Sequence, residues 1–145
     1  MVAESRDYGI VRLSDGTVLK LKITIVDARE AGFSPFAGVN IVVKTVGGIG
    51  VIEIPQELHG RVADKPVMPP EPPREGWEIV DIENYEPAVE ETRVNTSKGE
   101  FLVKVQAEPV MAARNLNYKT ELNEPPYWLN WVLKVSWRPV GGESR

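Results

Sequence analysis

The chain has 145 residues, of which 42% are hydrophobic and 26% are charged, and it carries a formal net charge of −4 and no cysteine. This length and composition fit one compact domain or two very small ones, and they argue against wholesale disorder. The lack of cysteine excludes disulfides, thiolate catalysis and zinc–sulfur sites, and no apolar run approaches the roughly 18 residues that a membrane-spanning helix needs.

The N-terminal stretch MVAESRDYG has neither a basic region nor an apolar core, so a standard secretion signal is not expected. Together with the missing cysteines, this favours a cytoplasmic protein, and a thermophilic source fits the same observation.

Charge is unevenly distributed along the chain. Residues 1–65 hold eight basic and eight acidic side chains, residues 66–91 hold one basic and eight acidic, and residues 92–145 hold eight basic and five acidic. A nucleic-acid-binding surface normally gives a basic face and a high pI, whereas the pI here is about 5.1. Nucleic acid is therefore a disfavoured partner, although the basic C-terminal third keeps it as an alternative.

The clearest local pattern is a β-hairpin near the N-terminus. Asp15-Gly16 lies between apolar runs at 10–13 and 18–26, and Asp-Gly is typical of a type I′ turn, in which both central residues have a positive φ. In the second run, apolar side chains alternate with polar ones, which predicts a strand with one face in the core and one in water.

A second hairpin is predicted from Val39 to Ile54, with Gly47-Gly48 as its turn. A phosphate-binding loop is the alternative, but no helix and no Lys-Ser/Thr pair follow these glycines. Between the two hairpins lies a loop, 32–38, that contains Phe33 and Phe36. The favoured interpretation is a corner that tucks both rings into the core, and the alternative is an exposed hydrophobic contact loop.

A proline-rich segment divides the chain. Pro55 to His59 predicts a single helical turn, and residues 66–73 then hold five prolines. Such a stretch favours extended polyproline II and is either a stiff crossover or a ligand for a peptide-binding module. We divide the sequence into an N-terminal β half (1–65), a proline-rich acidic crossover (66–76) and a C-terminal β half (77–145), which together form one compact domain.

The C-terminal half begins with a predicted strand from Trp77 to Ile82 and a break from Asn84 to Pro87. A third hairpin follows between about residues 90 and 107, with Gly99 in its turn. Residues 109–116 fit either a short helix or a bent continuation of the strand, and 117–124 are expected to be a loop.

The last long strand is predicted from Tyr127 to Trp137. Its odd positions are wholly apolar, whereas its even positions mix Trp128, Asn130, Val132, Lys134 and Ser136. An amphipathic helix is the alternative, but the unbroken parity favours a strand. The odd face is then core, with Trp131 as an anchor, and Trp128 lies on the mixed face.

Two segments, 11–19 and 94–102, share Val, Ser, Gly and Leu at an offset of 83 residues. A true duplication would give two similar three-stranded units that close on one another, with any ligand at the seam. The expected fold is therefore mainly β: an antiparallel sandwich or barrel built from hairpins, with one or two short helical turns.

Side chains for catalysis are scarce. Nucleophilic triads need a histidine, and the only one in the chain is His59, in a predicted turn. We predict no catalytic residue, no metal site and no cofactor. A carboxylate-based hydrolase remains an alternative, with Asp27, Glu30 and Glu53 as its acidic side chains.

Four acidic residues cluster after the proline segment. They lack the spacing of a calcium loop, so we interpret them as an acidic surface that is either solvated or an electrostatic partner for the basic C-terminal third. These residues are Glu78, Asp81, Glu83 and Glu86.

Three functions follow from these patterns. The first is a non-enzymatic protein-interaction or assembly module that binds a protein partner or its own copy through the last strand, the Phe33/Phe36 loop or free sheet edges. The second is a carbohydrate or small-ligand binder whose exposed aromatic rings stack on the ligand, and the third is the hydrolase. The candidate contact residues are Trp128, Asn130, Trp77, Tyr118, Phe33 and Phe36.

Overall fold

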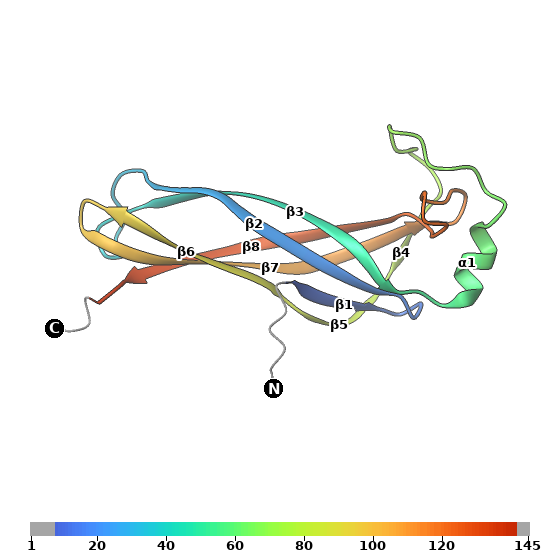
Figure 1. Ribbon diagram of the computed structural model, residues 1–145, viewed down its shortest axis with the longest axis horizontal. Helices are drawn as coiled ribbons and strands as arrows, with labels where there is room; N and C mark the ends of the chain where they lie inside the picture. Colours follow the sequence, from blue (N-terminus) through green and yellow to red (C-terminus); the bar gives the residue numbers. More distant parts are fainter. Residues whose placement is uncertain (1–7, 142–145) are drawn as a thin grey trace.

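Eight strands and one short helix make up the part of the chain that the computed structural model describes, residues 8–141 (Figure 1). In chain order they are β1 (Gly9–Leu13), β2 (Val18–Glu30), β3 (Ile41–Glu53), α1 (Gln56–Val62), β4 (Trp77–Val80), β5 (Ile82–Glu86), β6 (Ala88–Thr96), β7 (Gly99–Asn115) and β8 (Tyr127–Pro139). They form two antiparallel four-stranded sheets, so the predicted mainly β fold is confirmed as a two-sheet arrangement and not as a closed barrel.

Each sheet is built on a three-stranded meander. The first sheet has the order β3-β2-β1-β5, and in the second sheet β8 pairs with one edge of β7 while β6 and β4 share the other. The two meanders contain the two similar segments of the sequence. The matched residues Val11 and Val94 are both buried, but in the second strand of each segment the burial differs: Leu19 is fully buried, whereas Leu102 is half-buried.

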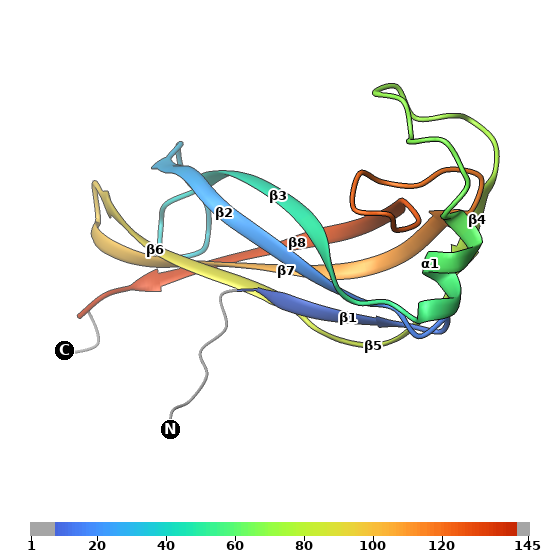
Figure 2. The same ribbon diagram turned by 45° about the vertical axis from the view of Figure 1, so that its right-hand side comes forward.

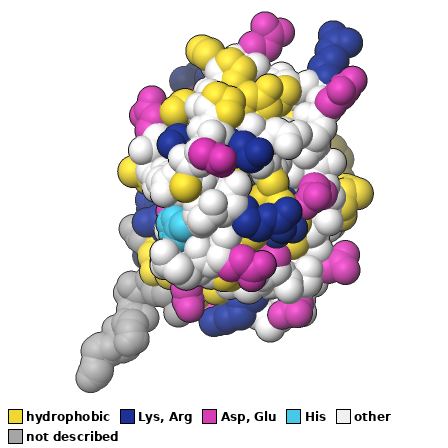
Figure 3. Space-filling model, turned by 90° about the vertical axis from the view of Figure 1, so that its right-hand side faces the viewer, with side chains coloured by type: hydrophobic (Ala, Val, Ile, Leu, Met, Phe, Trp, Pro, Cys, Tyr) yellow, Lys and Arg dark blue, Asp and Glu magenta, His cyan; other side chains and the backbone are white. Residues whose placement is uncertain are grey.

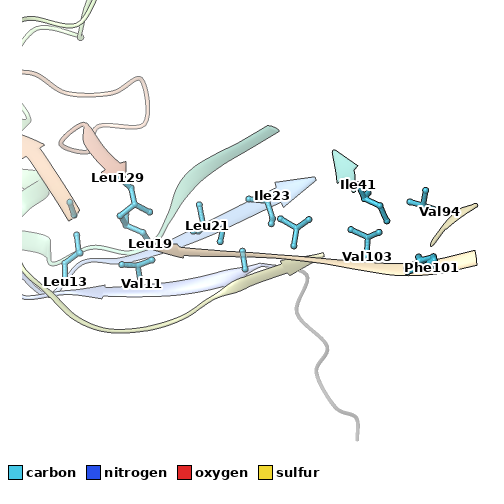
Figure 4. Close-up of a cluster of buried hydrophobic side chains, with 14 of the residues drawn as sticks. Val11, Leu13, Leu19, Leu21, Ile23, Ile41, Val94, Phe101, Val103 and Leu129 are labelled. Atoms are coloured by element: carbon cyan, nitrogen blue, oxygen red, sulfur yellow. The ribbon is translucent and has the colours of Figure 1, made fainter. Parts of the chain in front are cut away.

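The core lies between the sheets and follows the predicted alternation. On β2 the side chains of Leu19, Leu21 and Ile23 are buried, and they share one core cluster with Phe101 and Val103 of β7 (Figure 4). Lys20, Lys22 and Thr24 of β2 are exposed on the opposite face of the sheet. Side chains alternate between faces because the strand backbone is pleated.

The turn between β1 and β2 is not of type I′. Gly16 has a φ of +90°, but Asp15 is absent from the non-glycine residues with positive φ in the described part of the chain. The Asp15 carboxylate instead accepts a hydrogen bond from the Thr17 N–H at 2.9 Å. Such a local bond favours an Asx turn, in which the aspartate backbone needs no positive φ.

The predicted second hairpin is also wrong, because β3 runs unbroken through Gly47-Gly48 and pairs with β2 over its whole length. The reason lies on another strand. A Cβ at Gly47 would come within 2.9 Å of the Trp131 ring on β8, so the glycine makes room for that ring and does not reverse the chain.

A third correction concerns residues 84–87. The predicted strand 77–82 is interrupted at Asp81: Trp77–Val80 form β4, which pairs with β7 in the second sheet, whereas Ile82–Glu86 form β5, which pairs with β1 in the first. The predicted break therefore lies at Asp81 and Pro87 and not at 84–86. Residues 82–86 are mostly polar, so their own strand propensity is low. They form a strand because the free edge of β1 supplies backbone hydrogen-bond partners.

Several other strand predictions are confirmed. β6 and β7 form the third hairpin, with Gly99 at a φ of +106°. Residues 109–115 continue β7, with a bulge between Pro109 and Met111, and β8 covers the predicted last strand. Helix α1 follows Pro55 directly and is longer than the expected single turn. Within residues 8–141, no helix has the length and apolar character needed to cross a membrane.

Candidate functional site

The candidate contact residues fall into two groups at opposite ends of β8 and do not form one site. Trp77, Trp128 and Tyr118 lie at the end of the molecule that carries α1, where β8 begins. Phe33 and Phe36 lie at the other end, beside the last residues of β8 (Figures 1 and 2).

Trp77 and Trp128 contact one another. Their rings are 5.7 Å apart at 90°, and the Trp77 indole N–H donates to the Pro73 carbonyl at 2.8 Å. Trp128 is 53% exposed, and Asn130 is exposed on the same outer face of β8. The proline segment therefore fixes Trp77, which in turn supports the open ring of Trp128.

Tyr118 lies in the loop between β7 and β8 and lines a separate recess of about 490 Å³. The other lining residues are Pro66, Pro73, Arg74, Glu75, Gly76 and Asn117. Neither indole lines this recess, so Tyr118 and Trp128 do not act on one small ligand there.

The Phe33/Phe36 loop is exposed, contrary to the favoured prediction that both rings enter the core. Phe33 is 79% exposed and Phe36 is 70% exposed. The loop is closed on itself, because the Ser34 hydroxyl donates to the Val39 carbonyl at 2.6 Å and accepts from the Phe36 N–H at 3.1 Å. Within this segment Val39 is the residue that enters the core, whereas the rings of Phe33 and Phe36 stay exposed to solvent.

One of these rings reaches β8. Phe36 packs edge-on against Trp137 with ring centroids 6.4 Å apart, and the Trp137 indole N–H donates to the Phe36 carbonyl at 3.2 Å. Phe36 and Trp137 line a shallow groove of about 200 Å³ together with Val135 and Ser136. The lining is mostly apolar, which suits a protein contact better than a polar small molecule.

β8 is an edge strand along its whole length. In residues 8–141 its strand partner is β7. At one end of β8 the Val140 N–H donates to the Glu100 carbonyl, and at the other end the Pro126 carbonyl accepts from the Asn115 N–H. Even-numbered residues of β8 therefore direct their backbone N–H and C=O groups towards β7. Because these directions alternate along a strand, the odd residues from 129 to 137 direct their N–H and C=O groups to the open edge.

The inner face of β8 is only partly covered. Leu129 is buried, and Trp131 and Trp137 pack against the core, but Leu133 is 42% exposed and Val135 is 39% exposed. The prediction of a fully buried odd face is wrong for these two residues. The physical reason is that β8 lies at the open border of the second sheet, where it makes little contact with β3 of the first sheet.

The four residues of the acidic surface are exposed, but they do not form one cluster. Glu78 lies on β4 and bonds to Arg114 at 2.8 Å, whereas Glu86 lies on β5 with its carboxylate 4.0 Å from Arg12. Figure 3 shows basic and acidic side chains interspersed on the end of the molecule that carries α1. The ion pair of Glu78 with Arg114 joins the acidic surface to the basic C-terminal third.

A polar cluster that the sequence did not indicate joins the two sheets. The Asp15 carboxylate, in the turn of the first sheet, accepts from the Tyr127 hydroxyl at 2.8 Å and from Arg114 at 2.9 Å. The Thr17 hydroxyl lies 2.7 Å from the Tyr127 oxygen, and Arg114 also donates to Glu78. The side chains of Asp15 and Arg114 are only 11% and 16% exposed.

The cluster changes the pKa of each of its central groups. Burial raises the pKa of Asp15, but hydrogen bonds from Thr17, Tyr127 and Arg114 outweigh it and hold that pKa below its usual value. Burial and the neighbouring Asp15 carboxylate raise the pKa of Tyr127. Burial lowers the pKa of Arg114, but Glu78 and Asp15 more than offset this, so its pKa is raised. At neutral pH the cluster is a direct ion pair of Asp15 and Arg114, together with a neutral Tyr127 phenol that also donates to the Asp15 carboxylate.

The arrangement of carboxylates gives no support to the hydrolase alternative. Asp27 and Glu30 line one shallow recess, but Asp27 is paired with Arg29 at 2.8 Å, and both oxygens of Glu30 accept hydrogen bonds from Ser97. Those bonds lower the pKa of Glu30, whereas a general acid needs a raised one.

The described residues likewise give no support to a metal site. Residues 8–141 contain no group of three or more His, Asp or Glu side chains arranged to hold a metal ion. The ring of His59 is 2.8 Å from the Asn123 carbonyl, so it links α1 to the loop before β8.

Comparison with protein-family models, with curated proteins and with solved structures finds no significant match to this chain. The geometry of the molecule is therefore the only guide to its function.

Proposed function

We propose that this protein is a non-enzymatic protein-interaction or assembly module. The observation that carries the proposal is the open edge of β8, which combines outward-pointing backbone groups with exposed apolar side chains. The largest of these are Trp128, Val132, Leu133 and Val135. Natural proteins usually shorten, charge or cover such an edge, because an open strand is a template for pairing with another chain.

The surroundings of β8 support the same function. The exposed rings of Phe33 and Phe36 extend the apolar surface beyond the C-terminal end of the strand. Contiguous exposed apolar surface on a folded protein is typical of a contact site.

Strand addition can be tested with a proline placed on the edge. Val135 is an odd residue, so its N–H points away from β7, and Val135→Pro removes an outward donor without breaking the β7–β8 ladder. We would select random displayed peptides on the wild-type chain and measure their affinity for Val135→Pro and for the matched control Val135→Ala. The proposal expects peptides whose affinity falls by about tenfold or more, about 1.4 kcal/mol, with proline and little with alanine.

Sedimentation velocity over a wide concentration range complements this selection. It detects assembly of the chain with itself, which needs no second component. A chain that stays monomeric at every concentration and yields no peptide sensitive to Val135→Pro would refute the proposed function.

Carbohydrate or small-ligand binding is a second candidate, favoured by one observation. The Trp128 ring is open, is supported by Trp77 and lies two residues from the exposed amide of Asn130. An aromatic ring beside a polar amide is a common way to bind a sugar. Tryptophan fluorescence titrated with a glycan panel tests it: a saturable change that Trp128→Ala abolishes and Trp128→Phe retains would support binding, and a flat response would refute it.

A further inference from the structure

We infer that the chain pairs with a second copy of itself along β8, antiparallel, with Leu133 on the two-fold axis. This inference rests on the proposed assembly function and names the partner and the register. It follows from the backbone directions of β8, the length of the strand and the side chains that pairing would place opposite one another.

The backbone directions restrict the possible registers. Odd residues of β8 direct their N–H and C=O groups to the open edge, so two copies exchange hydrogen bonds only when odd residues face odd residues. Any register that places an odd residue opposite an even one leaves the outward groups of one copy without partners. This condition excludes half of the possible antiparallel registers.

The length of the strand selects one of the remaining registers. β8 runs from Tyr127 to Pro139, and Leu133 is its middle residue. A two-fold axis at Leu133 therefore pairs the whole strand, whereas an axis at any other residue leaves one end unpaired. Full-length pairing satisfies the largest number of backbone groups.

The outer face is self-complementary in this register. Trp128 lies opposite Arg138, Asn130 opposite Ser136, and Val132 opposite Lys134. These are a cation–π pair, a hydrogen-bonding pair and an apolar contact with a lysine stem. Moving the axis one residue towards the C-terminus would place Lys134 opposite its own copy, and like charges directly opposite one another are destabilising.

Pairing would bury apolar residues on the inner face of β8 that the first sheet leaves exposed. Leu133 would lie against Leu133 of the other copy, and Val135 against Trp131. Leu133 and Val135 are large apolar residues on the inner face of β8 that remain exposed in the single chain. Pairing thus removes from water the apolar side chains that the fold leaves open.

The other long edge strand of 13 residues, β3, is a weaker candidate for self-pairing. It contains Gly47, Gly48 and Gly50 near its middle. Glycine weakens a strand and gives a partner no side chain to pack against, so it specifies a register poorly. β8 contains no glycine.

The absence of cysteine makes the register directly measurable by disulfide trapping. Three single-cysteine variants are needed: Leu133→Cys, Asn130→Cys and Ser136→Cys. In the proposed register the two copies of residue 133 lie about 5.5 Å apart between Cα atoms, within the range of a disulfide. Residues 130 and 136 are each about 20 Å from their own copies but directly opposite one another.

We expect Leu133→Cys to form a dimer under mild oxidation, and Asn130→Cys and Ser136→Cys to cross-link when mixed but not alone. Edge contacts are small, so the free dimer is expected to be weak and the trapping should be done at high concentration. The mixed pair keeps Leu133 intact, so it tests the register even if the Leu133→Cys variant is less stable.

Three results would overturn the inference: no cross-link in any sample of folded protein, efficient self-linking of Asn130→Cys or Ser136→Cys, or equal linking in all samples. Peptides that bind the wild type but not Val135→Pro, in the absence of these cross-links, would refute self-pairing and leave the proposed function standing. If neither the cross-links nor peptides sensitive to Val135→Pro are found, both self-pairing and the proposed function are refuted.

Discussion

Removal of the negative charge of Asp15 tests whether the polar cluster holds the two sheets together. Asp15→Asn keeps the shape of the side chain but leaves Arg114 with Glu78 as its remaining carboxylate and weakens the bond from Tyr127. Hydrogen bonds to a charged group contribute about 1.5–3 kcal/mol each, and an almost buried cation that loses one of its two carboxylate partners adds a desolvation cost. We therefore expect unfolding to become easier by about 2–3 kcal/mol.

Urea denaturation followed by tryptophan fluorescence measures this change. With a slope of about 2 kcal/mol/M, the midpoint should fall by about 1–1.5 M, and the melting temperature should fall by roughly 4–12 °C. Asp27→Asn is the matched control, because Asp27 is paired with an arginine two residues away on an exposed surface. The control should change stability by less than about 0.5 kcal/mol.

The pH dependence adds a second check on Asp15. Its pKa is lowered in the folded protein, so its contribution is complete above the unfolded-state pKa of about 3.9 and is lost as the pH falls through the folded-state value. The stability difference between wild type and Asp15→Asn should therefore be constant near neutral pH and narrow below about pH 4. A variant as stable as the control, or a gap that stays constant in acid, would refute the assigned role.

Three further predictions concern the core and the same cluster. Gly47→Val should destabilise by about 1–3 kcal/mol because its side chain meets Trp131, whereas Gly48→Val, which has nothing within 4 Å, should be neutral or stabilising in thermal melts. Phe101→Ala should cost about 3–5 kcal/mol in urea denaturation, because the ring is 1% exposed and its loss leaves a cavity. Tyr127 should remain a phenol at about pH 11, so phenolate absorbance there should barely differ between wild type and Tyr127→Phe.

The parts of the fold that sequence reasoning predicted depend on neighbours close in the chain. Alternation along 18–26 and 127–137 reports which side of a strand meets the core, and it needs no knowledge of the partner strand. The β6–β7 hairpin was predictable for the same reason, since its turn and both strands lie within one short stretch of sequence.

The errors arise where a distant strand decides the local structure. Gly47-Gly48 has the composition of a turn, and only the ring of Trp131, 84 positions along from Gly47, explains a glycine inside a strand. Exposure of Leu133 and Val135 follows from the open border of the sheet, which the pattern of β8 alone does not contain.

The candidate site was predicted only in part. Trp128 and Asn130 are exposed as the mixed face suggested, but the sequence did not indicate that Trp77, 51 positions earlier, contacts the Trp128 ring. The Asp15 cluster was missed because its members are 99 and 112 positions apart and each looks ordinary in its own segment. One signal was available: a tyrosine on an apolar strand face needs a partner for its hydroxyl.

The pairing of β5 with β1 has a consequence for the order in which the chain can fold. The hairpin of β1 and β2 can form as soon as it is synthesised, but the first sheet lacks its last strand until residue 86 has emerged. The edge of β1 that pairs with β5 therefore stays unpaired while α1 and the proline-rich segment are being synthesised. Long-range closures of this kind slow folding and lengthen the exposure of unpaired strands to aggregation. A fragment ending before β5 should therefore be poorly soluble, although its own hairpins are complete.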